Sequence, residues 1–324
     1  MNNSEKGLKE RRKLLNKSLK LIPGNIQKSM NLHGVQTQTN IFFLGNRTYL
    51  KVYSLNLNKE FDDILRQKFV EVLCHTTLYR VRISSFVKRK DNTSNIMRFL
   101  TLYIEGVDYA EVHNEFRQED LNLANALAEI GINVKECSIN TILMLIHMNF
   151  FNEIRNYDIE DLLYQRENMR TLLFPDFVNQ NSSFLLKEPQ RFGMAFYGEN
   201  YTEIFHDANI IGKLGFDIQS CVDIQVMTEE ENRLFNYAIK RKYNYKYNMR
   251  DIKNVNMTFL LSLQSENEIR MAENVNRLKN IIGTSLYPCM KIQSTIHSSI
   301  CSFGILDYHK MRNVSESIIG GLVV

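Results

Sequence analysis

The stretch IMRFLTLYI at residues 96–104 decides the fold. Apolar side chains occupy both alternating faces of this run, which is typical of a strand with a neighbouring strand on each side. Glu105-Gly106 breaks the run, and an apolar stripe at helical spacing follows as far as Gly131, a residue type that favours the left-handed end of a helix. The stretch therefore predicts a central strand and then a long helix. The stripe comprises Val112, Phe116, Leu123, Leu127 and Ile130.

The segments on either side of this run complete a regular order of elements. The pattern predicts strands at 49–53, 79–83 and 132–135, a helix at 59–73 between the first two strands, and a helix that starts near Ile139 after the last. Residues 47–136 thus read strand, helix, strand, strand, helix, strand, which is the ferredoxin-like order. In that order the first and third strands are central and the second is an edge strand. The strict alternation of apolar and basic residues at 79–83 agrees with a half-buried edge.

The chain then repeats part of this order. A strand is expected at 218–226, a helix at 229–242, a strand at 257–263 and a helix at 266–282. Thr228 and Glu231 fit a capping box, in which the two side chains satisfy backbone amides at a helix start. The second long helix carries its own apolar stripe and ends at Gly283, before a short strand near 289–292 and a short helix from Thr295. The stripe comprises Ile269, Ala272, Val275, Leu278 and Ile282.

The sequence therefore predicts an α+β fold of two ferredoxin-like (βαββαβ-type) halves, of which the second is degenerate. A helical and polar linker joins them, with Asn179–Ser183 as its least structured part. The expected divisions are a basic N-terminal segment at 1–23, the first half at 24–151, the linker at 152–190 and the second half at 191–324.

Composition and cysteine usage favour a soluble protein. Hydrophobic residues make up 44% of the 324 residues and charged residues 23%, with a net charge of +4. No apolar run approaches the ~20 residues that span a bilayer, and the N-terminus lacks the features of a signal peptide. The five cysteines form no CxxC pair, which favours reduced thiols in the cytoplasm over a disulfide framework or a zinc site.

No catalytic motif stands out in the sequence. A phosphate loop, GxGxxG, HExxH and GxSxG are all absent from the 324 residues. Cys74-His75 lies at the end of an expected helix, where a packed thiol and a capping imidazole are far commoner than a catalytic pair. We therefore expect a non-enzymatic chain with no cofactor and no metal site.

One set of side chains merits a functional hypothesis. If Leu50, Val52, Val81, Ile83, Leu100 and Leu102 face the two helices, the opposite sheet face gathers aromatic and basic residues. Aromatic and basic residues on an open sheet are how RNA-recognition modules stack bases. The alternative, which is the commoner case, is that this face packs against the second half or a partner protein. The set comprises Tyr49, Lys51, Tyr53, Arg80, Arg82, Phe99 and Tyr103.

The N-terminal segment has a second candidate role. Its basic residues alternate with leucines, so a helix there would be amphipathic and suited to an anionic membrane surface. The alternative is a solvated terminal helix. The candidate membrane-contacting residues are Lys9, Arg11, Arg12, Lys13, Lys17 and Lys20.

The order and local composition of several segments are similar to those of one family. The segments are NRTYLKVYSL at 46–55, FLTLYIEG at 99–106 with its helix and GINV turn, MTFLLSLQS at 257–265, and Arg312-Asn313-Val314-Ser315 before an apolar, Gly-containing end. They resemble the N-terminal, non-motor region of the CagE/TrbE/VirB-type ATPases of conjugation and type IV secretion, in the form found in Gram-positive elements. The resemblance covers about residues 22–324 and rests on element order.

This resemblance implies a non-catalytic assembly domain of a DNA-transfer machine. Such a domain docks the cytoplasmic ATPase to inner-membrane subunits and to its own copies, and it lies in the cytoplasm at the inner face of the plasma membrane. The family's catalytic residues lie in a motor with a phosphate loop, which the 324 residues do not contain, so no catalytic residue carries over. The competing hypothesis is a single-stranded nucleic-acid-binding module that uses the aromatic and basic sheet face.

Overall fold

The structure is a computed structural model, and its described residues form one antiparallel sheet with helices. The described residues are 32–44, 47–57, 60–77, 79–90, 93–151, 153–158, 178–180, 184–186, 191–198, 214–243, 254–282, 286–288 and 312–315. The strands are β1 Leu32–Gln36, β2 Ile41–Leu44, β3 Thr48–Leu57, β4 Arg80–Lys90, β5 Thr93–Glu105, β6 Ile132–Glu136, β7 Val178–Gln180, β8 Phe184–Leu186, β9 Arg191–Gly198, β10 Ile218–Val226, β11 Asn254–Ser265, β12 Leu286–Pro288 and β13 Arg312–Ser315. The helices are α3 Asp63–Thr76, α4 Tyr109–Glu129, α5 Ile139–Phe151, α10 Glu229–Tyr243 and α11 Glu268–Ile282.

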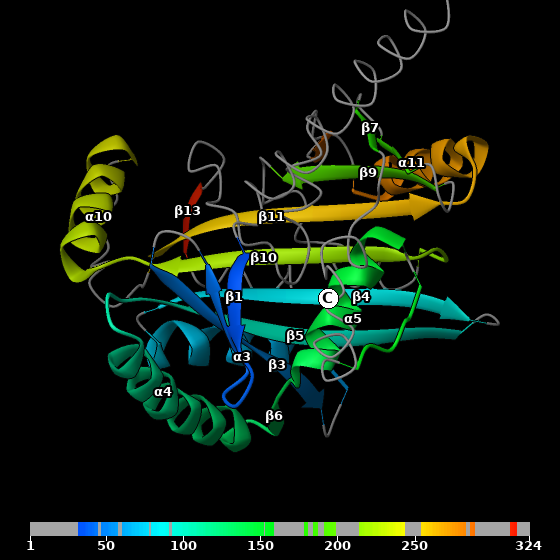
Figure 1. The fold of residues 1–324 in the computed structure, drawn as a ribbon. Helices are drawn as coiled ribbons and strands as arrows, with labels where there is room; N and C mark the ends of the chain where they lie inside the picture. The colour runs from blue at the N-terminus through cyan, green and yellow to red at the C-terminus, as the bar shows by residue number, and fades with distance from the viewer. Residues whose placement is uncertain are drawn as a thin grey trace, which may run out of the picture.

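All described strands belong to a single sheet, whose main path runs β1-β2-β3-β5-β4-β10-β11-β9-β8-β7. β6 pairs with β3, β12 with β9 and β13 with β11. Every pairing is antiparallel, including β4 with β10, which joins the N-terminal and C-terminal parts of the chain. The sheet is therefore continuous across the chain (Figure 1).

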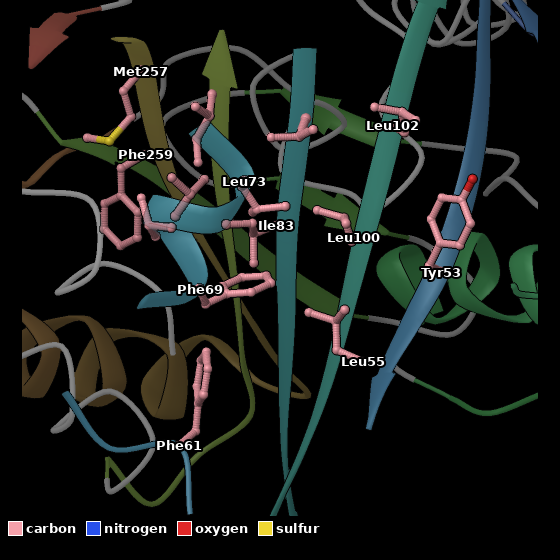
Figure 2. Close-up of a cluster of buried hydrophobic side chains, with 14 of the residues drawn as sticks. Tyr53, Leu55, Phe61, Phe69, Leu73, Ile83, Leu100, Leu102, Met257 and Phe259 are labelled. Atoms are coloured by element: carbon pink, nitrogen blue, oxygen red, sulfur yellow. The ribbon is translucent and has the colours of Figure 1, made fainter. Parts of the chain in front are cut away.

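Helices cover the two faces of this sheet unequally. α3, α4 and α11 share one buried cluster with alternate residues of β3, β4, β5, β10 and β11. In Figure 2 the rings of Phe69 and Phe259 lie in this cluster, although they come from distant parts of the sequence. The opposite face of β3, β4 and β5 is covered by α5, which passes in front of these strands in Figure 1. The centre of the sheet is thus buried on both faces.

Local signals in the sequence explain where several helices begin and end. The side chain of Asp62 accepts a hydrogen bond from the amide of Leu65 at 2.7 Å, which caps the start of α3. Thr228 and Glu231 form the predicted capping box of α10, with the Thr228 amide donating to Glu231 Oε2 at 2.9 Å. Gly131 has a φ of 85° and ends α4, as predicted.

The predicted edge position of the second strand is wrong. β4 lies between β5 and β10, and Arg82 on it is fully buried. The alternation of basic and apolar residues suggested a solvated face, but the basic face is covered and Arg82 is paired with a carboxylate. Asn179 and Gln180, which were expected in the linker, lie in β7 and pair with β8.

The predicted apolar stripe of α11 is only partly right. Val275 and Leu278 are buried as expected, but Ile269 is 74% exposed and Ala272 is exposed as well. Met271, which was not in the predicted stripe, is buried. The side of α11 that faces the sheet therefore carries Met271, Val275 and Leu278 at helical spacing.

Some predictions fall outside the described residues. These are the N-terminal segment, the helix end at Gly283, the strand near 289–292 and the helix from Thr295. Among the helices that the structure describes, none is both long and apolar enough to span a bilayer.

Candidate functional site

Tyr49, Lys51 and Tyr53 of β3 face the helices α3 and α4. Tyr49 and Tyr53 belong to the buried cluster that these helices cover, and they are 8% and 4% exposed. Leu50 and Val52, which were expected on this face, pack against α5 instead. The face assignment of β3 was therefore wrong by one residue, because both faces of this strand are buried and its pattern does not distinguish them.

Lys51 is the centre of a polar network within this face. Its ammonium group donates to Asp120 Oδ2 of α4 at 2.9 Å and to Glu136 Oε2 of β6 at 2.7 Å. Asn40, in the turn between β1 and β2, donates to the other oxygen of Glu136 at 2.7 Å. Burial acts to lower the pKa of Lys51, but the hydrogen bonds and charges of the two carboxylates together raise it. The network links β3, α4, β6 and the β1–β2 turn around the buried ammonium group of Lys51.

Tyr53 extends the same network. Its hydroxyl donates to Asp120 Oδ1. Burial, and then the negative charge of Asp120, raise the pKa of Tyr53 well above its ordinary value. A phenol held in this way stays neutral and serves as a structural hydrogen-bond donor. Because Tyr53 is buried, its ring is not presented to a ligand.

Arg80, Arg82, Phe99 and Tyr103 lie on the opposite face. Phe99 and Tyr103 are 6% and 5% exposed and belong to the cluster under α5. The prediction that all seven aromatic and basic residues share one open face is therefore wrong, since three face α3 and α4 and four face the other side. α5, which follows β6 directly, covers the rings that were expected to be open or to meet the second half.

Arg82 and Asp223 form a buried ion pair across β4 and β10. Arg82 Nη2 lies 2.6 Å from Asp223 Oδ2, Arg82 Nε lies 2.9 Å from Oδ1, and both side chains are fully buried. The two residues are directly opposed in the β4–β10 ladder. Burial acts to lower the pKa of Arg82, and the surrounding charges, that of Asp223 foremost, raise it overall. Two parallel hydrogen bonds of this kind fix the register of the strands.

Arg80 and Tyr103 flank this ion pair. Arg80 Nη2 lies 3.5 Å from Asp223 Oδ1, and its guanidinium lies 5.0 Å from the centre of the Tyr103 ring. Cys221, two residues before Asp223, is also fully buried, and burial raises the pKa of its thiol to about 12. A thiol with so high a pKa is a poor nucleophile. The arrangement suits a structural joint better than a reaction centre.

A hollow of about 320 Å³ lies beside the β1–β2 hairpin. The ring centre of Tyr49 lies 5.0 Å from that of Phe43 and 6.2 Å from that of Tyr109, so the wall is largely aromatic. The hydroxyl groups of Tyr109 and Thr39 are hydrogen-bonded at 2.7 Å. The lining residues are Val35, Gln36, Ile41, Phe43, Tyr49 and Tyr109.

The sequence analysis did not identify the acidic partners of Lys51 and Arg82. Asp223 had a usable signal, since a lone carboxylate in the middle of the apolar run IQSCVDIQV requires a buried cation. Asp120 and Glu136 had none, because acidic residues on a helix and on an edge strand are ordinarily solvated.

The remaining predicted features add no further site. Within the described ranges, no group of three or more His, Cys, Asp or Glu side chains could hold a metal ion. Cys74 and Cys137 are buried and form no disulfide bond. The predicted membrane-contacting residues Lys9 to Lys20 lie outside the described residues. No protein-family model matches the chain, and comparison with curated proteins found no match either.

Proposed function

We propose that this chain is a non-catalytic assembly domain of a conjugative, type IV secretion-like DNA-transfer machine. In this role it docks the machine's cytoplasmic ATPase to inner-membrane subunits. The proposal rests on the resemblance of its strands and helices to the non-motor region of the CagE/TrbE/VirB-type ATPases. It makes the chain a binding protein with no chemistry of its own.

The observation that carries an assembly role is the burial of the aromatic and basic set. Tyr53, Phe99 and Tyr103 are each at most 6% exposed, and Lys51 and Arg82 are held by carboxylates. These residues therefore build a rigid sheet with both faces covered. A rigid sheet leaves the outer surfaces of its helices and loops available to bind partners.

The strand order supports a further part of the proposal, namely two related ferredoxin-like halves. In the first part of the chain the order is β6-β3-β5-β4, and in the second it is β12-β9-β11-β10. Each is the same sequence of fourth, first, third and second strands. The halves meet where β4 pairs with β10, and α10 takes the place of the tight β4–β5 connection. We infer that the second half is a degenerate copy of the first.

Exposed apolar side chains mark where partners would bind. Large apolar residues on the surface of a folded chain indicate an interaction site when they gather on one element. Two of them lie on α10 and the others are single residues on separate elements. They are Ile64, Val107, Leu121, Ile154, Leu234, Tyr237 and Ile269, each exposed by 58% or more.

The basic N-terminal segment completes the proposed role. Its lysines and arginines would attach the chain to the anionic inner face of the plasma membrane, where each contributes about 1 kcal/mol. This attachment would place the domain in the cytoplasm beside the inner-membrane subunits of the machine.

The alternative function is binding of single-stranded nucleic acid. Base stacking needs an accessible ring, and the three aromatic residues expected to stack are covered by α3, α4 and α5. The assembly role is therefore the better supported of the two.

The test is a reconstitution with defined partners. The purified chain is immobilised and exposed in turn to the detergent-solubilised inner-membrane subunits and the motor ATPase encoded beside it. We expect saturable binding to at least one of them. If none of these subunits binds above the level of an unrelated immobilised protein, the proposed role is wrong.

A further inference from the structure

α10 is attached to the sheet along the side that carries Asn232 and Asn236. Asn254 at the start of β11 donates through Nδ2 to Asn232 Oδ1 at 2.5 Å and to Asn236 Oδ1 at 2.8 Å. Asn232 and Asn236 are one turn apart, so they define the side of α10 that faces the sheet. In Figure 1 the helix stands at one end of the molecule, beside the ends of β10 and β11. Its opposite side is turned away from the sheet.

The outward side of α10 carries an ordered stripe of four residues. Glu230, Leu234, Tyr237 and Arg241 follow one another at intervals of four, three and four residues, which places them on one side of an α-helix. Leu234 and Tyr237 are 58% and 66% exposed, and Glu230 and Arg241 are exposed as well. The stripe is acidic at the helix start, apolar in the middle and basic at the helix end.

This order is complementary to itself when reversed. Two copies of α10 can lie antiparallel so that the point between residues 235 and 236 of one helix is opposite the same point of the other. In this arrangement Glu230 of one helix lies opposite Arg241 of the other, and Leu234 lies opposite Tyr237. Both the charges and the apolar contacts are therefore satisfied by the same symmetric arrangement.

We propose that α10 is a homodimer interface, in which the outward stripe packs antiparallel against the same stripe of a second copy of this chain. A parallel arrangement is disfavoured because it brings Glu230 against Glu230 and Arg241 against Arg241. An anionic membrane is a poorer occupant, because Glu230 and Glu231 lie among the exposed residues of the helix. The proposal assigns the exposed apolar residues of α10 to self-association, and it is tested separately from the docking of other subunits.

The contact between two such helices is small. A helix of 15 residues is about 22 Å long, so a pair of them buries less than the ~1,200 Å² of an ordinary stable interface. We therefore expect a weak, concentration-dependent dimer whose strength falls as salt is raised.

Sedimentation velocity of the full chain over a wide concentration range tests the interface. We expect a monomer–dimer equilibrium in the wild type, and dissociation of the dimer by Leu234→Asp. Leu121→Asp on α4 is the matched control, since Leu121 is 67% exposed and lies on another helix. A wild type that stays monomeric at every concentration would overturn the proposal, as would a dimer unaffected by Leu234→Asp.

Charge reversal tests the antiparallel geometry and separates it from damage to the fold. Glu230→Arg and Arg241→Glu alone should each weaken the dimer by about tenfold or more, because each creates two repulsive contacts. The double variant should restore dimerisation, and so should an equimolar mixture of the two single variants, since every contact in the mixed dimer then joins opposite charges. If the mixture associates no better than either variant alone, the antiparallel interface is wrong.

Discussion

Arg82 of β4 and Asp223 of β10 are directly opposed in the sheet and share two hydrogen bonds, of 2.9 and 2.6 Å, although 141 positions separate them in the sequence. Among the described residues, β4 and β10 form the only pairing between strands β3 to β6 and strands β9 to β12, and the ion pair lies in this pairing. Because both side chains are fully buried, neither charge has water as an alternative partner. The pair therefore enforces one register between the two parts.

Replacing one member of this ion pair should destabilise the fold more than replacing both members. Arg82→Met or Asp223→Leu alone leaves a buried charge without its main partner and should lower the free energy of unfolding by about 3–5 kcal/mol. The double variant should be less destabilised than either single variant, as measured by urea denaturation in a double-mutant cycle. Additive losses would mean that the two side chains do not interact.

The Lys51 network should contribute to stability on a smaller scale. Lys51→Met removes the ammonium group that binds the carboxylates of Asp120 and Glu136. Because these two side chains are 27% and 34% exposed, water can replace part of the lost hydrogen bonding. We expect a loss of about 1–3 kcal/mol in the free energy of unfolding. Lys135→Met, at an exposed position of β6, is the control and should change it by less than about 0.5 kcal/mol. Equal losses in the free energy of unfolding for Lys51→Met and Lys135→Met would show that the Lys51 network does not stabilise the fold.

Stability should fall as the solution becomes alkaline. Burial raises the pKa of Cys137 and of Cys221 from 9.0 to about 12, so the folded state favours the neutral thiols. Their contribution is complete below pH 9.0 and is lost as the pH rises from there toward about 12, because the unfolded chain releases these protons first. The melting temperature should therefore decline from pH 8 to pH 10.5 less steeply in a Cys137→Ala/Cys221→Ala variant. Parallel declines in the two proteins would show that the thiols do not titrate as described.

Removal of residues 1–22 should abolish salt-sensitive binding to anionic vesicles and leave the melting temperature unchanged. The reason is that the basic residues are attracted to acidic headgroups and the leucines insert shallowly. Co-sedimentation with vesicles that contain phosphatidylserine measures this, and vesicles of neutral lipid are the control. Equal sedimentation of the full and shortened chains would show that the segment only keeps the protein in solution.

Local patterns in the sequence predicted the elements far better than their arrangement. The strand at 96–104, the helix after it, the turn at Gly131 and the capping box at Thr228 all follow from side chains close together in the chain. These features depend on backbone conformation and nearby hydrogen bonds, which short segments determine by themselves.

The arrangement of faces and strands depends on contacts that no local pattern contains. β3 is buried on both sides, so nothing in its own residues showed that Lys51 and Tyr53 would face Asp120. The pairing of β4 with β10 follows from the match between Arg82 and a carboxylate far along the chain. That match also explains why a strand with alternating basic residues is interior.

In the assembly domain that we propose, the aromatic and basic residues build the core and do not form a nucleic-acid surface. Tyr53, Phe99 and Tyr103 lie on opposite faces of the sheet, and helices cover all three. A core ring and a stacking ring respond differently to truncation, so one substitution separates the two functions.

The most direct test is Phe99→Ala, with unfolding by urea and binding of a labelled single-stranded oligonucleotide measured on the same preparation. Phe99 is 6% exposed and its ring centre lies 5.9 Å from that of Phe86, so its truncation should lower the free energy of unfolding by about 3–5 kcal/mol. Neither the wild type nor the variant should bind the oligonucleotide specifically. A variant as stable as the wild type that loses a micromolar affinity for single strands would contradict the account.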